Sequence, residues 1–340
     1  MVDGNDKVML AHGGGGQLSN DLIRKYILPN VGNDVLNQLG DSASLELESG
    51  SICFTTDSYV VKPLFFNGGD IGKLAVCGTM NDLAVSGARP VALSLALIIE
   101  TGLELEILER ILKSIGETAR QNNISIVTGD TKTVEAGSAD KIFITTAGIG
   151  VRVSGAVPGM DKIKSGDKII VNGTLGDHGM TIISQRKGIS FESKLKSDCA
   201  VLWPLIEQML MKCGGGVRFM RDATRGGAAA TLNEIACATG MNVEICEKAL
   251  PINPTVRAAA DMLGFDVLDI ANEGKFIAVV SPGCAGECLR ICKNHPLGKD
   301  AAIIGEVGEV SKRGLVELIT RIGGRRVIQL PYGRELPRIC

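Results

Sequence analysis

From about residue 50 to residue 155, the sequence alternates strand-like and helix-like segments. The strand-like segments are SICFTTD, PVALSLALII, ISIVTGDT and KIFITTAGIGV, which are rich in β-branched and apolar residues, as buried strands are. Between the second and third of these, apolar residues recur at spacings of three and four; they are Leu105, Leu108, Leu112, Ile115 and Ala119. This pattern predicts an amphipathic helix that lies on a sheet, and therefore an α/β domain.

A second α/β unit follows a loop that contains three glycines and a proline, SGAVPGMDKIKSGD at 154–167. It begins with strand-like DKIIVNG, continues with expected helices near 178–187 and 198–212, and alternates onward through VRFMRD, FIAVVS, AAIIGEV, GLVELIT and RVIQL. A chain of 340 residues exceeds the length at which one core keeps growing efficiently. We therefore expect four parts: a glycine-rich segment at 1–35, domains at 36–155 and 160–330, and an extended, mobile tail at 331–340.

The charge balance and hydropathy exclude two classes of partner. Lys and Arg total 36 against 38 Asp and Glu, so no basic surplus draws the whole chain onto nucleic acid or an anionic membrane. No apolar run approaches the ~20 residues of a membrane span, and the first residues show no basic segment followed by an apolar one. We expect a cytoplasmic protein that binds small molecules or other proteins.

The ten cysteines include no CxxC pair, so reduced thiols are expected. Cys284, Cys288 and Cys292 recur every four residues, which would align three sulfurs on one helix as a metal-binding face. Buried free cysteine behaves as a small hydrophobe, and a stripe facing the core is the favoured interpretation. Cys340 differs from the rest, because it ends the sequence where a fold does not easily enclose it.

One acidic residue stands within a long apolar segment. In IGKLAVCGTMNDLAVSG the only charges are Lys73 and Asp82, and at 100° per residue Asp82 falls on the apolar stripe opposite Lys73. A carboxylate on such a stripe costs several kcal/mol in desolvation unless a cation or hydrogen-bond donors compensate it.

Four more aspartates lie where strands or turns end. Asp57 ends ICFTTD, Asp130 ends ISIVTGD two residues before Lys132, Asp222 ends VRFMRD, and Asp41 lies in LGDSAS. Each alone is typical of a helix cap or turn. Five such acids beside Gly/Thr turns favour oxygen ligation of Mg²⁺ with a bridging nucleotide phosphate.

Two glycine-rich stretches are consistent with phosphate binding. HGGGGQ at 12–17, with Gly13 and Gly14, would close over phosphates with its backbone N–H groups, unless it is simply a flexible segment. TRGG at 224–227 opens an expected helix, whose N-terminus favours an anion. The sequence lacks GxxxxGK[ST], so it is not a P-loop protein.

His178 and Glu273 have two interpretations each. His178 follows the turn in GTLGDHG and either contacts an anion or is a structural histidine. Glu273 in ANEGK, two residues before Lys275, is either a general base or a turn cap.

Several motifs together resemble the HypE family of hydrogenase-maturation carbamoyl dehydratases, which belongs to the superfamily of aminoimidazole ribonucleotide (AIR) synthetase and selenophosphate synthetase. The motifs are TTDSYVVKPLFFNGGDIGKLAVCGTMNDLAVSGARP, IVTGDTK, GTLGDHG, RDATRGG, ANEGK, HPLGKDAA, IGEV and the terminal PRIC. The resemblance covers nearly the whole chain, and PRIC is its most specific part. It implies an AIR synthase-like, PurM-like α/β N-terminal domain whose sheet pairs in a homodimer, an α+β C-terminal domain, and ATP beside the dimer interface.

The resemblance also implies a reaction. The carbamoyltransferase HypF loads the terminal cysteine with a carbamoyl group, ATP drives its dehydration to a thiocyanate, and the cyanide passes to iron on the HypC–HypD complex for the nickel–iron hydrogenase centre. Cys340 would carry the group, Glu273 would be the base and Lys132 would lie at the phosphates. Mg²⁺ ligands would be Asp41, Asp82, Asp222 and Asp130; nucleotide contacts would be Asp57, Asp130, Thr128, Gly129, His178, Gly13 and Gly14.

One residue departs from the superfamily pattern, and two other functions are open. Ser42 stands where relatives often place a second acid, which leaves the ligand count at that metal open. A selenophosphate synthetase-like kinase would carry a cysteine or selenocysteine in its N-terminal glycine-rich loop, and here no cysteine precedes Cys53. A non-catalytic adaptor that docks through PRIC would have no use for buried acids.

Overall fold

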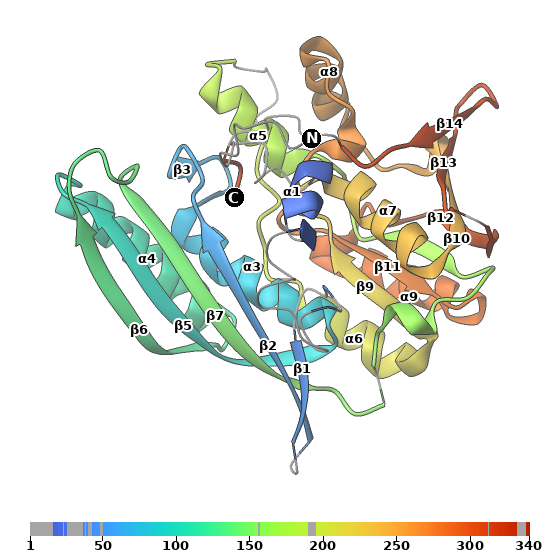
Figure 1. The fold of residues 1–340 in the computed structure, drawn as a ribbon, viewed down its shortest axis with the longest axis horizontal. Coiled ribbons are helices and arrows are strands. Elements are labelled where there is room, and N and C mark those ends of the chain that lie inside the picture. The colour runs from blue at the N-terminus through green and yellow to red at the C-terminus, as the bar shows by residue number, and fades with distance from the viewer. Residues whose placement is uncertain are drawn as a thin grey trace.

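Two β-sheets and the helices that cover them form the body of the protein (Figure 1). The computed structural model describes residues 16–22, 24–25, 37, 39, 43–47, 50–155, 157–189, 195–311, 313–331 and 338–340. The strands are β1 (Ala43–Leu47), β2 (Gly50–Tyr59), β3 (Phe65–Phe66), β4 (Gly69–Asp70), β5 (Ala88–Glu100), β6 (Ser125–Val134), β7 (Ile142–Arg152), β8 (Lys168–Val171), β9 (Val217–Asp222), β10 (Met241–Cys246), β11 (Phe276–Val280), β12 (Ala302–Val310), β13 (Val316–Ile319) and β14 (Arg325–Ile328). The α-helices are α1 (Gln17–Leu22), α3 (Ile71–Val85), α4 (Leu105–Gln121), α5 (Asp177–Arg186), α6 (Trp203–Cys213), α7 (Gly227–Thr239), α8 (Pro254–Leu263) and α9 (Pro282–Asn294).

The first sheet has the order β1-β2-β7-β5-β6, and its two faces differ. Helix α3 packs on one face and α4 packs against α3 and β6, so we call this the covered face. Its side chains include the fully buried Leu93 and Ile144. The opposite, open face carries exposed apolar side chains, which include Phe54, Ile98 and Ile149. Because side chains alternate along a strand, the register decides which face each site residue reaches.

Helix α3 lies between the two sheets and is buried on almost all sides. It contacts β2, β5 and β7 of the first sheet, α4, and α6 and β9 of the second unit. Lys73 and Asp82 are the two of its fifteen residues that are not buried. Gly72 lets α4 approach, because a Cβ at this position would lie 2.6 Å from the backbone oxygen of Ile111. Burial between two layers explains why the α3 sequence is nearly all apolar rather than amphipathic.

The second sheet has the order β14-β13-β10-β12-β8-β11-β9 and has helices on both faces. Ile277 and Val279 of β11 face the cluster that includes α7, while Ala278 and Val280 face the cluster that includes α6 and α9. All five residues of β11 are buried, which explains its continuous apolar sequence. Within the described residues, no helix is both long enough and apolar enough to cross a membrane.

Most expected elements are present, two expectations were wrong in detail, and one strand was not predicted. The predicted helix between the second and third strands is α4, but its buried stripe is Ile111, Ile115, Thr118 and Ala119, while Leu105 and Leu112 are exposed. The helix expected at 198–212 begins only at Trp203, with Pro204 in its first turn. Strand β10, MNVEIC, was not predicted, because an asparagine and a glutamate interrupt its run of apolar residues.

Candidate active site

The segment Arg338–Cys340, which we call the tail segment, lies against the chain just after β2. The Val60 N–H donates to the Cys340 carbonyl at 3.2 Å, and the Lys62 N–H donates to the Arg338 carbonyl at 3.2 Å. These bonds run as between antiparallel strands, and the C-terminus lies beside β2 and β3 (Figure 1). The expectation that a fold would not enclose Cys340 was wrong for this conformation, since Cys340 packs against the main core and Ile339 is 5% exposed.

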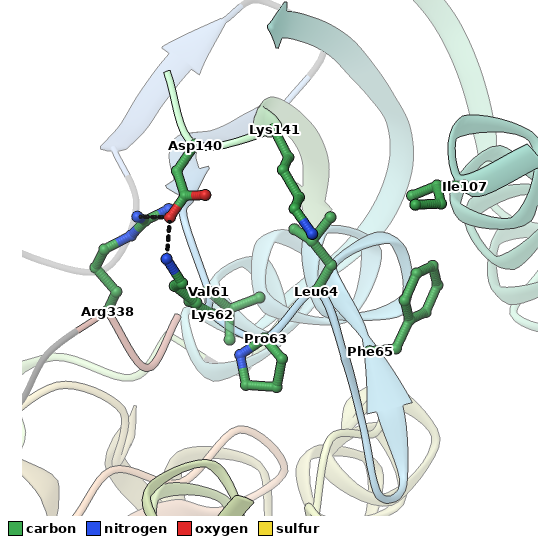
Figure 2. Close-up of a pocket in the computed structure, with 9 residues that line it drawn as sticks. All are labelled: Val61, Lys62, Pro63, Leu64, Phe65, Ile107, Asp140, Lys141 and Arg338. Carbon is green, nitrogen blue, oxygen red and sulfur yellow. Dashed lines mark hydrogen bonds and ion pairs between the residues drawn. The ribbon is translucent and has the colours of Figure 1, made fainter. Parts of the chain in front are cut away.

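The side chain of Arg338 anchors the tail segment from outside. Its Nε donates to the Val60 carbonyl at 2.7 Å, and its Nη1 donates to Asp140 Oδ2 at 2.7 Å. Asp140 also accepts from Lys62 Nζ at 2.8 Å, so one carboxylate joins two cations (Figure 2). These cations lower the pKa of Asp140, Lys62 most strongly. Arg186 donates from its side chain to the Arg338 carbonyl.

Four ionisable side chains act electrostatically on the thiol of Cys340, and we call Asp57, Asp222, Glu273 and Arg225 the thiol cluster. Burial raises the pKa of Cys340 to about 12, and the negative fields of Glu273, Asp57 and Asp222 add to this, while Arg225 opposes it. The pKa of Arg225 is raised, chiefly by Cys340 and then, against burial, by Asp57, Glu273 and Asp82. These groups come from β2, the end of β9 and the segments before α7 and β11. Residues far apart in sequence therefore meet at one sulfur.

Glu273 is the most deeply buried acid of the thiol cluster. It is 3% exposed, and its Oε1 has no hydrogen-bond partner among the described residues. Burial raises its pKa well above the usual range, and repulsion by Asp222, Asp198 and Asp57 raises it further. A titratable group with a strongly raised pKa and an unused oxygen is typical of an active site.

A buried ion pair holds the backbone of Glu273 in place. Lys275 Nζ lies 3.0 Å from Asp198 Oδ2, and both side chains are at most 10% exposed. Asp198 Oδ1 accepts the Glu273 N–H at 3.1 Å, and Asn81 of α3 donates to the Glu273 carbonyl at 3.1 Å. Burial alone would raise the pKa of Asp198, but Lys275, His178 and the Glu273 N–H bring it below its usual value. Both domains therefore fix the position of Glu273.

Asp82 and Tyr59 complete the covered-face wall of the site. Thr55 Oγ1 donates to Asp82 Oδ2 at 2.8 Å, which compensates part of the desolvation expected from the sequence. The Tyr59 hydroxyl lies 3.2 Å from Thr79 Oγ1, and burial, Asp57 and Asp82 raise its pKa well above the usual range. Gly78 makes room for this hydroxyl, because a Cβ there would lie 2.3 Å from Tyr59 Oη.

The predicted site residues of the IVTGDTK motif do not lie at the thiol cluster. They form part of β6, the edge strand of the first sheet, and the residues are Thr128, Gly129, Asp130 and Lys132. The strand register connects Asp130 to β2 through three cross-strand pairs: Asp130 with Ala96, Ala96 with Thr145, and Thr145 with Ser58. Paired residues lie on the same face of a sheet, so Asp130 shares the open face with Ser58. Asp57 points to the covered face. Three strand spacings, about 14 Å, separate Asp130 from β2, and the chain by itself does not bring Asp130 to the thiol cluster.

Asp130 and Lys132 form an exposed ion pair on this strand. Lys132 Nζ lies 2.8 Å from Asp130 Oδ2, with side chains 70% and 61% exposed. Asp41, Gly13 and Gly14 lie outside the described residues, so their predicted roles stay predictions. His178 is described, and its Nε2 lies against the Ile339 carbonyl rather than a free anion site. Its predicted contact with nucleotide also stays a prediction.

Sequence reasoning missed Arg225 and Asp198 as site residues. Arg225 lies in TRGG, which was interpreted through the backbone of the helix that follows. Its position three residues after the strand-ending Asp222 was the available signal. Asp198 gave no signal, because its role depends on Lys275, 77 residues away.

The cysteines of α9 face the core, as the favoured interpretation predicted. Cys288 and Cys292 are fully buried, and Cys288 lies 3.3 Å from Cys213 of α6, measured between the sulfurs. Among the described residues, no group of three or more His, Cys, Asp or Glu side chains is arranged to hold a metal ion.

Comparison with known proteins confirms the expected fold class. Residues 39–152 match the family of AIR synthase related proteins, N-terminal domain, and residues 164–316 match the corresponding C-terminal domain. The chain is 46% identical to carbamoyl dehydratase HypE of Escherichia coli strain K12 over 340 residues, covering 98% of this chain and 100% of that protein.

Two solved structures are similar over most of the chain. A chain of a HypE–HypF complex gives a TM-score of 0.86 at 44% identity, covering 91% of this chain and 99% of that one. HypE in complex with ATP gives a TM-score of 0.83 at 42% identity, covering 98% and 100%.

Proposed function

Because the chain belongs to the HypE family of carbamoyl dehydratases, we propose that it uses ATP to dehydrate an S-carbamoyl group on Cys340 to a thiocyanate. The observation that supports this most strongly is the thiol of Cys340 lying within the thiol cluster. A solved relative binds ATP, which supports ATP as the co-substrate here. The thiocyanate would supply the cyanide ligand of the iron in nickel–iron hydrogenase.

The reaction replaces a poor leaving group by a good one. The amide oxygen of the carbamoyl group attacks the γ-phosphorus of ATP, the bond to the β,γ-bridging oxygen breaks, and ADP leaves as one N–H proton is lost. The second N–H proton then leaves as the C–O bond breaks, which gives the thiocyanate and inorganic phosphate. The chain must therefore stabilise charge on the transferred phosphoryl group and accept protons from nitrogen.

Glu273 is the proposed proton acceptor. A carboxylate whose pKa is raised by burial is a stronger base than one in water, and Arg225 lowers this pKa and favours the ionised form. The unused Oε1 is free to accept the N–H proton. Arg225 is also suited to stabilise negative charge as it develops on the carbamoyl oxygen.

The acids near Cys340 fit Mg²⁺ by their chemistry. They offer oxygen ligands, and Asp222 and Asp57 raise the pKa of Glu273, as neighbouring negative charges do. Asp82 and Asp222 would hold the ion, with Asp41 and Asp130 as further predicted ligands. When bound, Mg²⁺ would neutralise charge on the phosphates of ATP.

A homodimer formed through the open face would place the β6 residues at the interface between subunits. The open face of the first sheet exposes Phe54, Ile98, Ile149 and Val151 at 40–44% of their surface, and an apolar face of this kind is typical of a subunit interface. Asp130 and Lys132 lie on that face, so pairing would place them against a second subunit. We propose that Lys132 and the nucleotide contacts of β6 serve the site of the other subunit.

The proposed partners are those of the loading and delivery steps. A solved relative forms a complex with HypF, which supports loading of Cys340 by a HypF carbamoyltransferase. Delivery of the cyanide to an iron-carrying HypC–HypD complex, and a cytoplasmic location, complete the proposal.

Intact-mass analysis tests the proposed function. After incubation with HypF, carbamoyl phosphate, ATP and Mg²⁺, the chain is expected to gain one carbamoyl group and then lose one water. A chain that hydrolyses ATP without ever losing water from the carbamoylated form would contradict the proposal. A cyano adduct mapped to a cysteine other than Cys340 would do the same.

A further inference from the structure

The imidazole of His178 lies between a serine and the tail segment. His178 is fully buried near the start of α5; its Nε2 lies 2.8 Å from the Ile339 carbonyl oxygen, and its Nδ1 lies 2.7 Å from Ser197 Oγ. A carbonyl oxygen only accepts, so Nε2 carries the proton and Nδ1 accepts from the Ser197 hydroxyl. Ser197 Oγ in turn accepts the Cys199 N–H at 3.1 Å. Each donor in this chain of hydrogen bonds has one acceptor.

The surroundings of His178 keep the ring neutral and fixed. Burial lowers its pKa, with only partial opposition from Asp198 and the Ile339 carbonyl. The ring of Phe66 meets the imidazole edge to face at a centroid distance of 5.4 Å. The backbone N–H of Ser197 donates to the Asn67 carbonyl at 2.8 Å, which fixes the serine as well. The donor at Nε2 is therefore held in place before the tail segment arrives.

We propose that His178 is a positioning residue that holds the Ile339 carbonyl and thereby aims the adduct on Cys340 at the thiol cluster. The inference rests on the proposed function, since it assigns a role in placing the carbamoyl group. The Ile339 carbonyl belongs to the peptide that joins Ile339 to Cys340, so its bond to His178 sets the orientation of the last residue. The Val60 N–H holds the next carbonyl, and the two bonds together fix both ends of Cys340.

His178 holds the tail segment differently from Arg338. The Arg338–Asp140 pair is 25% and 31% exposed, so solvent weakens it. The bond from His178 is buried, and its loss would leave a carbonyl without a partner in a site that excludes water. We therefore expect the hydrogen bond from the neutral His178 ring to stabilise the docked tail segment more than the exposed Arg338–Asp140 ion pair does.

Two amide variants separate positioning from packing. In His178→Gln the side-chain amide reaches the place of Nε2 and keeps a donor for Ile339. In His178→Asn the amide reaches only the place of Nδ1, so it keeps a partner for Ser197 but loses the Ile339 bond. Both variants are polar and similar in size, so a difference between them reports the donor at Nε2.

The readout is the rate at which iodoacetamide alkylates Cys340 in the full-length protein, followed by peptide mass spectrometry. A thiolate is the reacting form, and the docked thiol has a pKa of about 12, so alkylation reports undocking of the tail segment. Cys292, fully buried beside α6, is an internal reference whose slow alkylation shows that the variant is folded. His295→Gln is the matched control, because His295 accepts a hydrogen bond from the Leu297 N–H and, within the part of the chain that the structure describes, makes no hydrogen bond to the tail segment.

We expect His178→Asn to raise the alkylation rate of Cys340 by about tenfold, the effect of losing one buried hydrogen bond. His178→Gln and His295→Gln should stay within about threefold of the parent, and Cys292 should stay slow in all. Equal Cys340 rates in the Asn and Gln variants would overturn the proposal, whether both match the parent or both exceed it by the same factor.

A second arm separates this inference from the proposed function. Dehydration of chains already carbamoylated on Cys340 should slow in His178→Asn and recover in His178→Gln. If the parent chain shows no dehydration at all, the proposed function fails, while the alkylation rates still decide whether His178 positions the tail segment.

Discussion

The predicted site divides into two regions that are built in opposite ways. The thiol cluster lies on the covered side of the first sheet, where burial raises the pKa of Glu273 and of Asp57. The β6 motif lies on the open face of the same sheet, and its Asp130–Lys132 pair is exposed. Burial changes the proton affinity of acids in the first region, whereas the second region presents an ion pair to solvent. This difference is the reason for our proposal that acid–base chemistry belongs to the first region and phosphate binding to the second.

Removing the Cys340 thiol should have the largest effect, because the reacting group is attached to it. We expect Cys340→Ala to bind ATP and to form no thiocyanate, measured by ATP titration and by mass spectrometry. Cys237→Ala is the matched control, since Cys237 is an exposed thiol of α7. Thiocyanate formation by Cys340→Ala would show that the thiol cluster surrounds the wrong sulfur.

Glu273→Gln tests the buried acid of the first region. We expect the dehydration rate to fall by about 10²–10⁴, the usual contribution of a general base, while carbamoyl loading by HypF continues. The carbamoylated chain should therefore accumulate, which intact mass detects. Glu234→Gln is the control, because Glu234 is a half-buried acid that also has a raised pKa but pairs with Arg221 at 2.8 Å. Equal rates for the two variants would remove Glu273 from the mechanism.

Lys132→Met tests the exposed region. We expect ATP turnover to fall by about 10–100-fold through lost stabilisation of the phosphates. The free energy of unfolding should change by no more than ~1 kcal/mol, because an exposed ion pair contributes little to stability. Lys113→Met is the control, since Lys113 also faces an acid, Glu117, on the surface of α4. A large loss of stability with unchanged turnover would reverse the assignment.

The smallest effect concerns the pH dependence of stability. Because the folded pKa of Glu273 is raised, the folded chain binds a proton that the unfolded chain releases above about 4.5. Stability is therefore lost as pH rises from that value toward the folded pKa. Glu273→Gln should remove this loss, so its melting temperature at neutral pH should exceed that of the parent, with a smaller difference at pH 4. A constant difference across this range would contradict the raised pKa.

The sequence was sufficient for the fold class, since strand and helix periods were strong and the motifs resembled one family. Which face of a helix is buried was harder to predict. Leu105 and Leu112 fit the same helical stripe as Ile115, yet α4 leaves them exposed and buries Ile111 beside Ile115, because Gly72 sets where α3 and α4 touch. A period gives the width of an apolar face, whereas the neighbouring helix decides which part of it is buried.

Prediction of the site residues was likewise limited to what the sequence pattern gives without the neighbouring elements. Asp57, Asp82 and Asp222 stood out because acids at strand ends or in apolar segments are costly unless they are used, whereas Glu273 was assigned as the base only through the family resemblance. Arg225 and Asp198 were missed because arginine and aspartate in loops are ordinary, and only the fold brings them to Cys340 and Lys275. Asp57 and Asp130 shared one signature, yet the sheet register places them on opposite faces.

Mixed dimers test most directly whether one site uses the thiol cluster of one chain and the β6 motif of the other. Glu273→Gln and Lys132→Met chains would be co-expressed with different tags, and dimers that carry both tags would be purified and loaded with carbamoyl groups. Each such dimer has one intact site and one doubly altered site, so we expect about half of the parent thiocyanate yield, well above either variant alone. Tagged mixed dimers with no more activity than the separate variants would contradict a site shared between subunits.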